Sequence, residues 1–414
     1  MRRAFLPLLS AMVLGLSGCG GGDASSEFGD TPPSEARGTL VSSTLLKHYG
    51  TAEMNLLFDY EGIDLDAEID VSLYNVTYWT VDAAGNPYLA SGAVAIPDST
   101  TNAGLISYQH STATQKTNVP GSNNDEALLI LAVFASNGHY IVSMPDYVGL
   151  GSGAGLHPFL HAATEATASI DAMRAARQLA PKKGVTLNSG LFLCGYSQGG
   201  HSTMALAKAI QENYASEFQP TAIAPMSGPY APAEVELPFA LNTPSADSST
   251  FMAYITLAYQ SVYGNVYSNL SDVFQSPYDT QVTALFNGQN DLSDIAGQLP
   301  ADPKNLFTAS YVDDILNDAS SPMRLALAQN ELWNWTPTTQ MRLYAAESDE
   351  VVSYQNTVNA YNYMSGQGAP VTLVDLGTGL THVNAIFKAT PLALVWFDQI
   401  SGYSTPTLAS RHPR

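Results

Sequence analysis

Residues 191–201 have the sequence Leu-Phe-Leu-Cys-Gly-Tyr-Ser-Gln-Gly-Gly-His, and the segment that follows, residues 202–210, is typical of a helix. A short apolar run that ends in Gly-x-Ser-x-Gly and continues into a helix predicts a strand, a sharp turn and a helix. Glycines on either side of Ser197 let the strand and the helix pass closely, because they carry no side chain. The turn is expected to hold Ser197 in a strained conformation with its hydroxyl exposed.

Ser197 is therefore a candidate nucleophile. The N-terminus of the following helix offers free N–H groups and a positive dipole to a developing negative charge. A serine hydroxyl needs a neighbouring base near neutral pH, and an imidazole suits that role. His382 is the candidate base, because it ends a loop that follows the last predicted strand. Asp349 follows the preceding strand and is the candidate carboxylate that orients the imidazole.

Other acids and histidines compete for these roles. Glu347 and Glu350 flank Asp349 and are either solvated loop acids or substitutes for it. Asp375 lies inside a predicted strand, which places it too far back. His201 is expected to pack under the turn and His110 to shape a neighbouring loop. The following histidines have no acid partner that the sequence can place: His139, His157 and His161.

An oxyanion that forms at Ser197 needs two hydrogen-bond donors. One is the backbone N–H of Gln198, the residue after the nucleophile. The second is expected from the loop that follows a predicted strand at residues 105–110, with Thr112 as the first candidate and Ser111 as the second.

Composition limits the class of protein. The chain has 414 residues, enough for one large domain or two, and 45% of them are hydrophobic, which indicates a globular protein. The net charge of −21 argues against nucleic acid as a partner and against charge-driven binding to anionic membranes.

The N-terminus has the pattern of a targeting segment. Residues 1–18 carry two arginines after Met1 and continue with an apolar run too short to span a bilayer, which predicts a signal peptide. The sequence Leu16-Ser17-Gly18-Cys19 resembles a bacterial lipobox, which implies cleavage before Cys19 and a lipid on its sulfur. The alternative is an ordinary signal peptide with an incidental cysteine. Residues 19–38 are rich in Gly, Ser, Pro and acids and predict a flexible tether. Contact with a membrane is expected through this lipid alone, at the outer membrane or the periplasmic face, because Gly20 follows the cysteine.

The remaining chain predicts an α/β fold. Residues 40–61 are interpreted as a helical lead-in and residues 74–97 as a β-hairpin. From residue 105 onward, strand-like and helix-like segments alternate, which predicts a mostly parallel central sheet with helices on both faces. Ligands of such sheets bind at the carboxyl ends of the strands.

Residues 231–335 interrupt the alternation and predict a mostly helical cap over the strand ends. The core then comprises residues 39–230 and 336–403, with a tail at 404–414. Several cap aromatics either line an acyl pocket or pack the cap's own core: Phe251, Tyr254, Tyr259, Tyr263, Trp333 and Trp335.

Four motifs carry a family resemblance. They are the turn around Ser197, the loop at 108–112, Pro-Asp-Tyr-Val-Gly-Leu-Gly at 145–151, and Asp-Ala-Met-Arg-Ala at 171–175. Together they resemble the α/β-hydrolase superfamily and are most similar to the secretory lipase family. The resemblance covers residues 80–400 and implies an α/β-hydrolase fold with a cap over a tunnel for acyl chains.

The expected function is hydrolysis of carboxylic esters, with a small-molecule ester or a lipid as substrate and an acyl-enzyme intermediate. This chemistry requires no cofactor, and the sequence has no metal-spaced His or Cys cluster. A serine aminopeptidase or amidase on the same fold is the alternative, for which cap acids could bind a substrate amine: Asp291, Asp294, Asp313 and Asp314. A surface-anchored binding protein that lost the chemistry is a third hypothesis.

Overall fold

The computed structural model describes residues 37–245 and 247–404. Their strands form a nine-stranded sheet in the order β1-β2-β3-β5-β4-β6-β7-β8-β9. The pairs β1–β2, β2–β3 and β3–β5 are antiparallel, and all pairs from β5–β4 to β8–β9 are parallel. The strands are β1 (Leu40–Tyr49), β2 (Val71–Val81), β3 (Pro87–Pro97), β4 (Asn102–Gln109), β5 (Tyr140–Pro145), β6 (Thr186–Tyr196), β7 (Ala222–Met226), β8 (Met341–Ala345) and β9 (Val371–Asp375).

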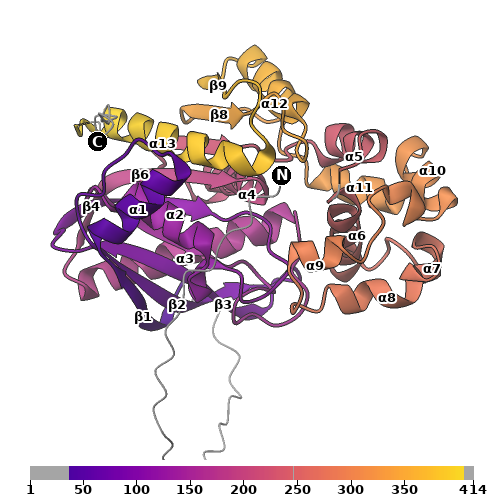
Figure 1. Ribbon diagram of the computed structural model, residues 1–414, viewed down its shortest axis with the longest axis horizontal. Coiled ribbons are helices and arrows are strands. Elements are labelled where there is room, and N and C mark those ends of the chain that lie inside the picture. The colour runs from indigo at the N-terminus through magenta and orange to yellow at the C-terminus, as the bar shows by residue number, and fades with distance from the viewer. Residues whose placement is uncertain (1–36, 246, 405–414) are drawn as a thin grey trace, which may run out of the picture.

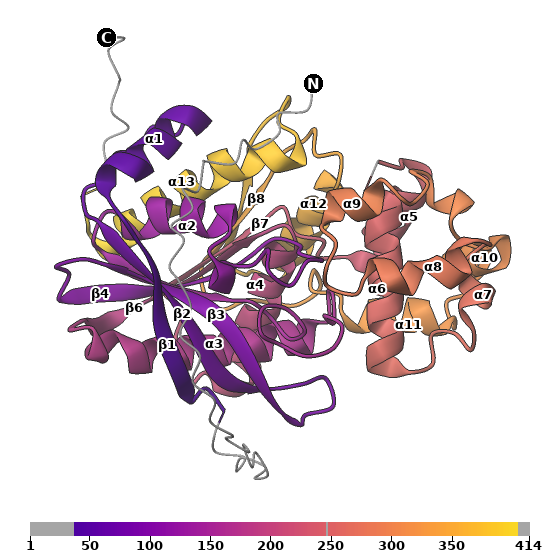
Figure 2. The same cartoon turned by 60° about the horizontal axis from the view of Figure 1, so that its bottom comes forward.

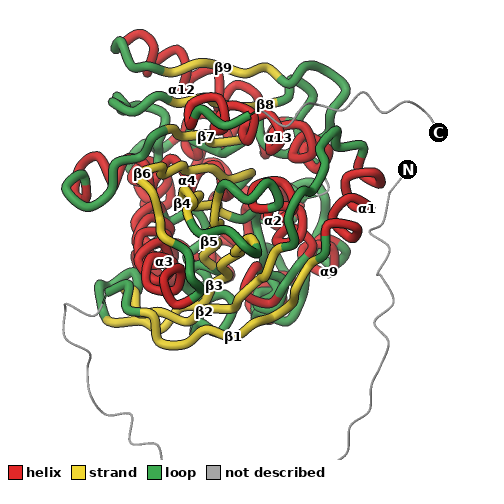
Figure 3. Tube along the Cα trace, turned by 90° about the vertical axis from the view of Figure 1, so that its left-hand side faces the viewer, coloured by secondary structure: helices red, strands yellow, loops and turns green. Residues whose placement is uncertain are grey.

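Helices cover both faces of this sheet, as Figure 3 shows in an end-on view. One face packs against α1 (Thr51–Glu61), α2 (Asp125–Ala135) and α13 (His382–Ser401). The other packs against α3 (Ala162–Lys182), α4 (Gln198–Ala209) and α12 (Tyr354–Gly366). Two short segments, η2 (Pro120–Ser122) and η3 (Ile210–Tyr214), complete the core. The prediction of a mostly parallel α/β sheet is confirmed.

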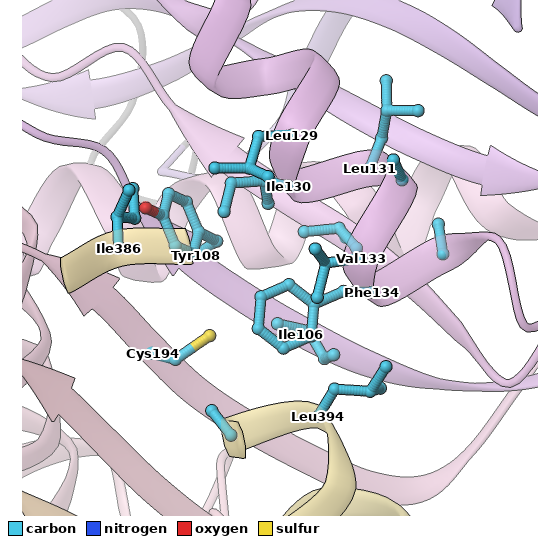
Figure 4. Close-up of a cluster of buried hydrophobic side chains, with 14 of the residues drawn as sticks. Ile106, Tyr108, Leu129, Ile130, Leu131, Val133, Phe134, Cys194, Ile386 and Leu394 are labelled. Carbon is cyan, nitrogen blue, oxygen red and sulfur yellow. The ribbon is translucent and has the colours of Figure 1, made fainter. Parts of the chain in front are cut away.

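Alternate residues of the central strands point to opposite faces and build a separate core on each. Ile106 and Tyr108 of β4 pack with Phe134 of α2 and Leu394 of α13 on one face (Figure 4). Cys194 of β6 lies in the same cluster, and burial raises the pKa of its thiol well above the usual value. Cys194 is therefore a small core residue rather than a reactive thiol.

The cap is inserted between β7 and β8 and lies beside the sheet, at the right in Figures 1 and 2. Its apolar residues form a core of their own around α6. The cap elements are η4 (Pro232–Glu236), α5 (Leu237–Asn242), α6 (Ser248–Tyr263), α7 (Leu270–Val273), α8 (Tyr278–Leu285), α9 (Leu292–Ala296), η5 (Pro303–Asn305), α10 (Ala309–Asn317) and α11 (Pro322–Gln329).

The lead-in segment differs from its prediction. Residues 40–61 are not one helix, because β1 occupies the first half and only α1 is helical. β1 pairs with β2 along its whole length, from Leu40 opposite Tyr78 to Tyr49 opposite Val71. This pairing joins distant segments of the chain, and it outweighs the local helix preference of Leu and Lys.

The predicted lipidation residue Cys19 lies outside the described residues, as do the rest of the signal peptide and most of the tether. None of the helices in the described ranges is both long enough and apolar enough to cross a membrane.

Candidate active site

The turn between β6 and α4 has the geometry expected of a nucleophile elbow. Ser197 adopts φ 58° and ψ −122°, a conformation that non-glycine residues rarely take. A Cβ atom on Gly199 would lie 1.9 Å from the carbonyl oxygen of Gln109, and one on Gly195 would lie 2.4 Å from that of Gly199. Glycine is therefore required at both positions for β4, β6 and α4 to pack this closely.

Three predicted residues from separate loops meet at this elbow. His382 Nε2 lies 2.9 Å from Ser197 Oγ, and His382 Nδ1 lies 2.7 Å from Asp349 Oδ2. Asp349 follows β8, while His382 begins α13. Because a carboxylate only accepts hydrogen bonds, Nδ1 carries the proton and Nε2 is left to accept the serine hydroxyl proton. The arrangement can therefore activate Ser197 by removing its proton.

The Asp349 loop is fixed by its own hydrogen bonds. Asp349 Oδ1 accepts the N–H groups of Val351 at 3.0 Å and Val352 at 2.9 Å, which leaves Oδ2 directed at His382. The rival Glu350 accepts the backbone N–H of His382 at 3.0 Å, so it supports the loop and does not face the imidazole nitrogens.

The candidate oxyanion donors separate into free and occupied groups. The N–H groups of Gln198 and Thr112 make no hydrogen bond within the described ranges, and both residues line the same cavity as Ser197. The N–H of Ser111 instead donates to both carboxylate oxygens of Glu126, at 3.0 and 3.2 Å. Ser111 is therefore wrong as a donor, because its N–H already has a partner. Gln198 and Thr112 remain candidates.

Glu126 and the cap hold the loop that carries Thr112. The Glu126 carboxylate also accepts the Tyr108 hydroxyl at 2.7 Å. From the cap, the Tyr254 hydroxyl donates to Ala113 O at 3.1 Å, and Thr114 Oγ1 donates to Asn290 O at 2.9 Å. The loop is thus fixed between the core and the cap.

The remaining buried histidines near the elbow are not bases for Ser197. His110 donates from Nδ1 to Ser111 O at 2.6 Å and packs in the oxyanion loop, and His201 pairs with Glu165. Burial lowers the pKa values of His110 and His157 to about 4, so both are neutral near pH 7. Sequence reasoning missed Glu165, although an acid within the alanine-rich, apolar run 162–180 was a usable signal.

A cavity with an empty volume of about 820 Å³, mouth included, extends from Ser197 into the cap. Its walls are mainly apolar side chains: Leu160, Leu237, Phe251, Met252, Ile255, Ile315, Met323 and Leu327. Of the cap aromatics proposed for this role, Phe251 lines the cavity. Tyr254 and Tyr259 bind backbone carbonyls with their hydroxyls, and the two tryptophans pack against the core instead.

The acids proposed for an amine clamp lie elsewhere. Asp291 is the half-buried N-cap of α9 and accepts the N–H of Asp294, while Asp294 is exposed on α9 and Asp313 and Asp314 are exposed on α10. Glu236 does line the cavity, where Ser353 N–H and the Asn356 side chain bind its carboxyl. Burial raises the pKa of Glu236 well above its usual value, which favours the neutral acid. Among the described residues that line the cavity, Glu236 is the acid, and in its neutral form it offers no ion pair to a substrate amine.

This combination of sheet, elbow and cap is the α/β-hydrolase fold. Residues 115–406 match the secretory lipase family, and the chain belongs to that family. It is a hydrolase that acts on esters.

Solved structures agree with this family. The rice cell wall degrading esterase LipA from Xanthomonas oryzae has a TM-score of 0.78 and 31% identity, over 89% of this chain and 96% of that one. A protein from Legionella pneumophila has a TM-score of 0.83 and 27% identity, over 91% of this chain and 100% of the other. Candida antarctica lipase A in its closed state shares the fold, with a TM-score of 0.68 and 18% identity over 93% and 88%. The search of curated protein sequences found no match.

Proposed function

We propose that this protein is a carboxylic-ester hydrolase that acts through Ser197, His382 and Asp349 with an acyl-enzyme intermediate. The observation that carries the proposal is the chain of hydrogen bonds from Ser197 Oγ to His382 at 2.9 Å and from His382 to Asp349 at 2.7 Å. Ser197 at the end of this chain lines an apolar cavity.

The proposed reaction proceeds in two halves. Ser197 Oγ attacks the ester carbonyl carbon while His382 Nε2 takes the hydroxyl proton, and the resulting oxyanion accepts hydrogen bonds from the N–H groups of Gln198 and Thr112. The tetrahedral intermediate expels the alcohol, which leaves with the proton from His382. Water then attacks the acyl-enzyme while His382 takes a proton from the water. His382 returns that proton to Ser197 Oγ as the carboxylic acid departs.

The proposed substrate places its acyl chain in the cavity. The apolar walls contributed by α6 and α11 remove methylene groups from water, which stabilises a bound acyl chain by about 0.8 kcal/mol for each methylene. An extended hydrocarbon chain therefore fits this cavity better than a charged or amine-bearing group.

Filling this cavity should change the acyl-chain preference. Leu327→Trp in α11 places an indole among the lining residues, so kcat/KM for a dodecanoyl p-nitrophenyl ester is expected to fall at least about tenfold relative to the acetyl ester. Leu325→Trp on the same helix is the control, because its side chain is 49% exposed, and it should leave the profile unchanged. An equal loss for both esters in Leu327→Trp would contradict the acyl assignment.

We further propose that the protein is exported and anchored through a lipid on Cys19. The signal-like residues 1–18 and membership in a secretory family support this proposal. When the full chain is expressed in a bacterium, Cys19→Ser should abolish incorporation of a labelled fatty acid and move the protein to the soluble fraction. The control Cys194→Ser should keep both properties, and a fatty acid retained by Cys19→Ser would refute the anchor.

A further inference from the structure

Glu165 is a buried acid next to the elbow for which the proposed reaction has no use. It lies in the first turn of α3, and its side chain is fully buried. Oε1 accepts a hydrogen bond from Gln198 Nε2 at 2.8 Å, and Oε2 accepts one from His201 Nδ1 at 2.7 Å. Burying a carboxylate costs free energy unless its oxygens accept hydrogen bonds. A buried acid such as Glu165 is therefore expected either to be well paired or to serve the function of the site.

The Gln198 side chain can take only one orientation against Glu165. Its amide nitrogen also lies 2.7 Å from His157 Nε2, and His157 Nδ1 donates to Val148 O at 2.7 Å. His157 Nε2 is therefore an acceptor, and turning the amide over would place its oxygen against two acceptors. Both hydrogens of the amide group are thus used to fix the residue that follows the nucleophile.

His201 forms an ion pair with Glu165. Its Nδ1 meets Glu165, and its Nε2 lies 2.9 Å from the carbonyl oxygen of Asn330, which can only accept. Both ring nitrogens of His201 thus face acceptors, an arrangement that an imidazolium satisfies with two donated hydrogen bonds. Burial alone would raise the pKa of the Glu165 carboxyl, but this imidazolium lowers it below the usual value. The carboxylate therefore keeps its charge at the elbow.

The same contacts reach the cap. Asn330 follows α11, its Oδ1 accepts the N–H of Ala162 at the start of α3 at 2.9 Å, and its Nδ2 donates to the Tyr263 hydroxyl of α6 at 2.8 Å. One hydrogen-bonded network thus joins the first turns of α3 and α4 to two cap helices.

We infer that Glu165 is a positioning residue, which holds the N–H of Gln198 in the oxyanion hole and ties it through His201 to the cap at Asn330. The inference rests on the proposed function. Ser197 has a strained backbone with φ 58°, and such strain persists only where the surroundings fix the chain. The amide tether is the side-chain contact that fixes the next residue. A donor displaced by a fraction of an ångström loses much of its value in the transition state.

The test compares Glu165→Ala and Glu165→Gln in the full chain. Glu165→Ala is expected to lower kcat for a short p-nitrophenyl ester by roughly 10² with KM changed less than about threefold, because the oxyanion donor acts in the transition state. The Ki of a trifluoromethyl ketone, which forms a tetrahedral adduct with its oxygen in the hole, should rise by a similar factor. Glu165→Gln keeps an acceptor for Gln198 and a donor for a neutral His201, so kcat should recover to within about fivefold of wild type.

Asp398→Ala is the control for a merely structural effect. Asp398 is fully buried on α13, where its carboxylate accepts the Tyr140 hydroxyl at 2.8 Å, far along the helix from His382. It should lower Tm and leave kcat and the ketone Ki within about threefold. If Asp398→Ala loses as much kcat as Glu165→Ala, or if the ketone Ki of Glu165→Ala is unchanged, the inference is overturned.

Two further cases are a Glu165→Ala variant that does not fold and a wild-type protein that is inactive. If Glu165→Ala does not fold, Gln198→Met removes the same side-chain hydrogen bond from the other partner and leaves the backbone N–H in place. It should then show the same loss of kcat and the same rise in Ki. A fully active Gln198→Met would overturn the inference. If wild-type protein hydrolyses no ester, the proposed function itself fails. If the wild-type protein is active and Glu165→Ala is equally active, the positioning role of Glu165 is refuted while the proposed function stands.

Discussion

Replacing Ser197 with alanine is expected to lower kcat for p-nitrophenyl esters by roughly 10⁶-fold, because the variant has no oxygen to attack the carbonyl carbon. Within the described part of the chain, the hydroxyl makes one hydrogen bond, to His382 Nε2 at 2.9 Å, so the fold should remain intact. Initial rates over a range of ester concentrations measure the loss, and Tm checks the fold.

Ser202→Ala is the matched control for this variant. Ser202 is a buried serine of α4, the helix that follows Ser197, and its hydroxyl lies outside the chain of hydrogen bonds that ends at Asp349. Its removal is expected to leave kcat within about threefold of wild type. Undiminished turnover by Ser197→Ala would show that Ser197 is not the nucleophile.

Asp349→Asn is expected to lower kcat/KM by about 10⁴-fold without a large change in structure. An amide at this position donates to His382 Nδ1, so the neutral imidazole carries its proton on Nε2. Nε2 then has no lone pair with which to accept the serine hydroxyl proton. Steady-state kinetics on a short ester measures this loss.

Glu350→Gln distinguishes the two neighbouring acids. Glu350 accepts the backbone N–H of His382 at 3.0 Å, so an amide oxygen can replace that bond and the loss should stay below about tenfold. A larger loss in Glu350→Gln than in Asp349→Asn would show that the acid has been assigned to the wrong residue.

The elbow could be predicted from sequence because its chemistry is local. Gly-x-Ser-x-Gly between an apolar run and a helix predicts both the turn and the order in which Asp349 and His382 must follow. The structure places the His382 imidazole within hydrogen-bond distance of both Ser197 Oγ and the Asp349 carboxylate. The alternation of strands and helices similarly predicted the parallel sheet.

Features set by distant parts of the chain could not be predicted in this way. β1 is a strand because it pairs with β2, and nothing within residues 40–49 reveals that partner. Ser111 was the second candidate donor after Thr112, and no sequence pattern reveals that the Glu126 carboxylate occupies its N–H. Among the cap aromatics, the choice between cavity and core depends on the tertiary path of α6.

The Glu165 network shows the same limit. Its members come from five places in the sequence: the loop at His157, the first turn of α3, the first turn of α4, Tyr263 of α6, and Asn330 after α11. Sequence spacing identifies His201 as buried below the elbow, but only the fold shows which acid it meets. The hydrogen bond that holds the Gln198 side chain likewise depends on contacts that only the fold brings together.

Covalent labelling of the folded protein with a fluorophosphonate, followed by peptide mass spectrometry, tests the central claim most directly. One adduct is expected, on Ser197; it should be absent in Ser197→Ala and form far more slowly in His382→Ala. No adduct on well-folded protein, or an adduct on a different serine, would contradict it.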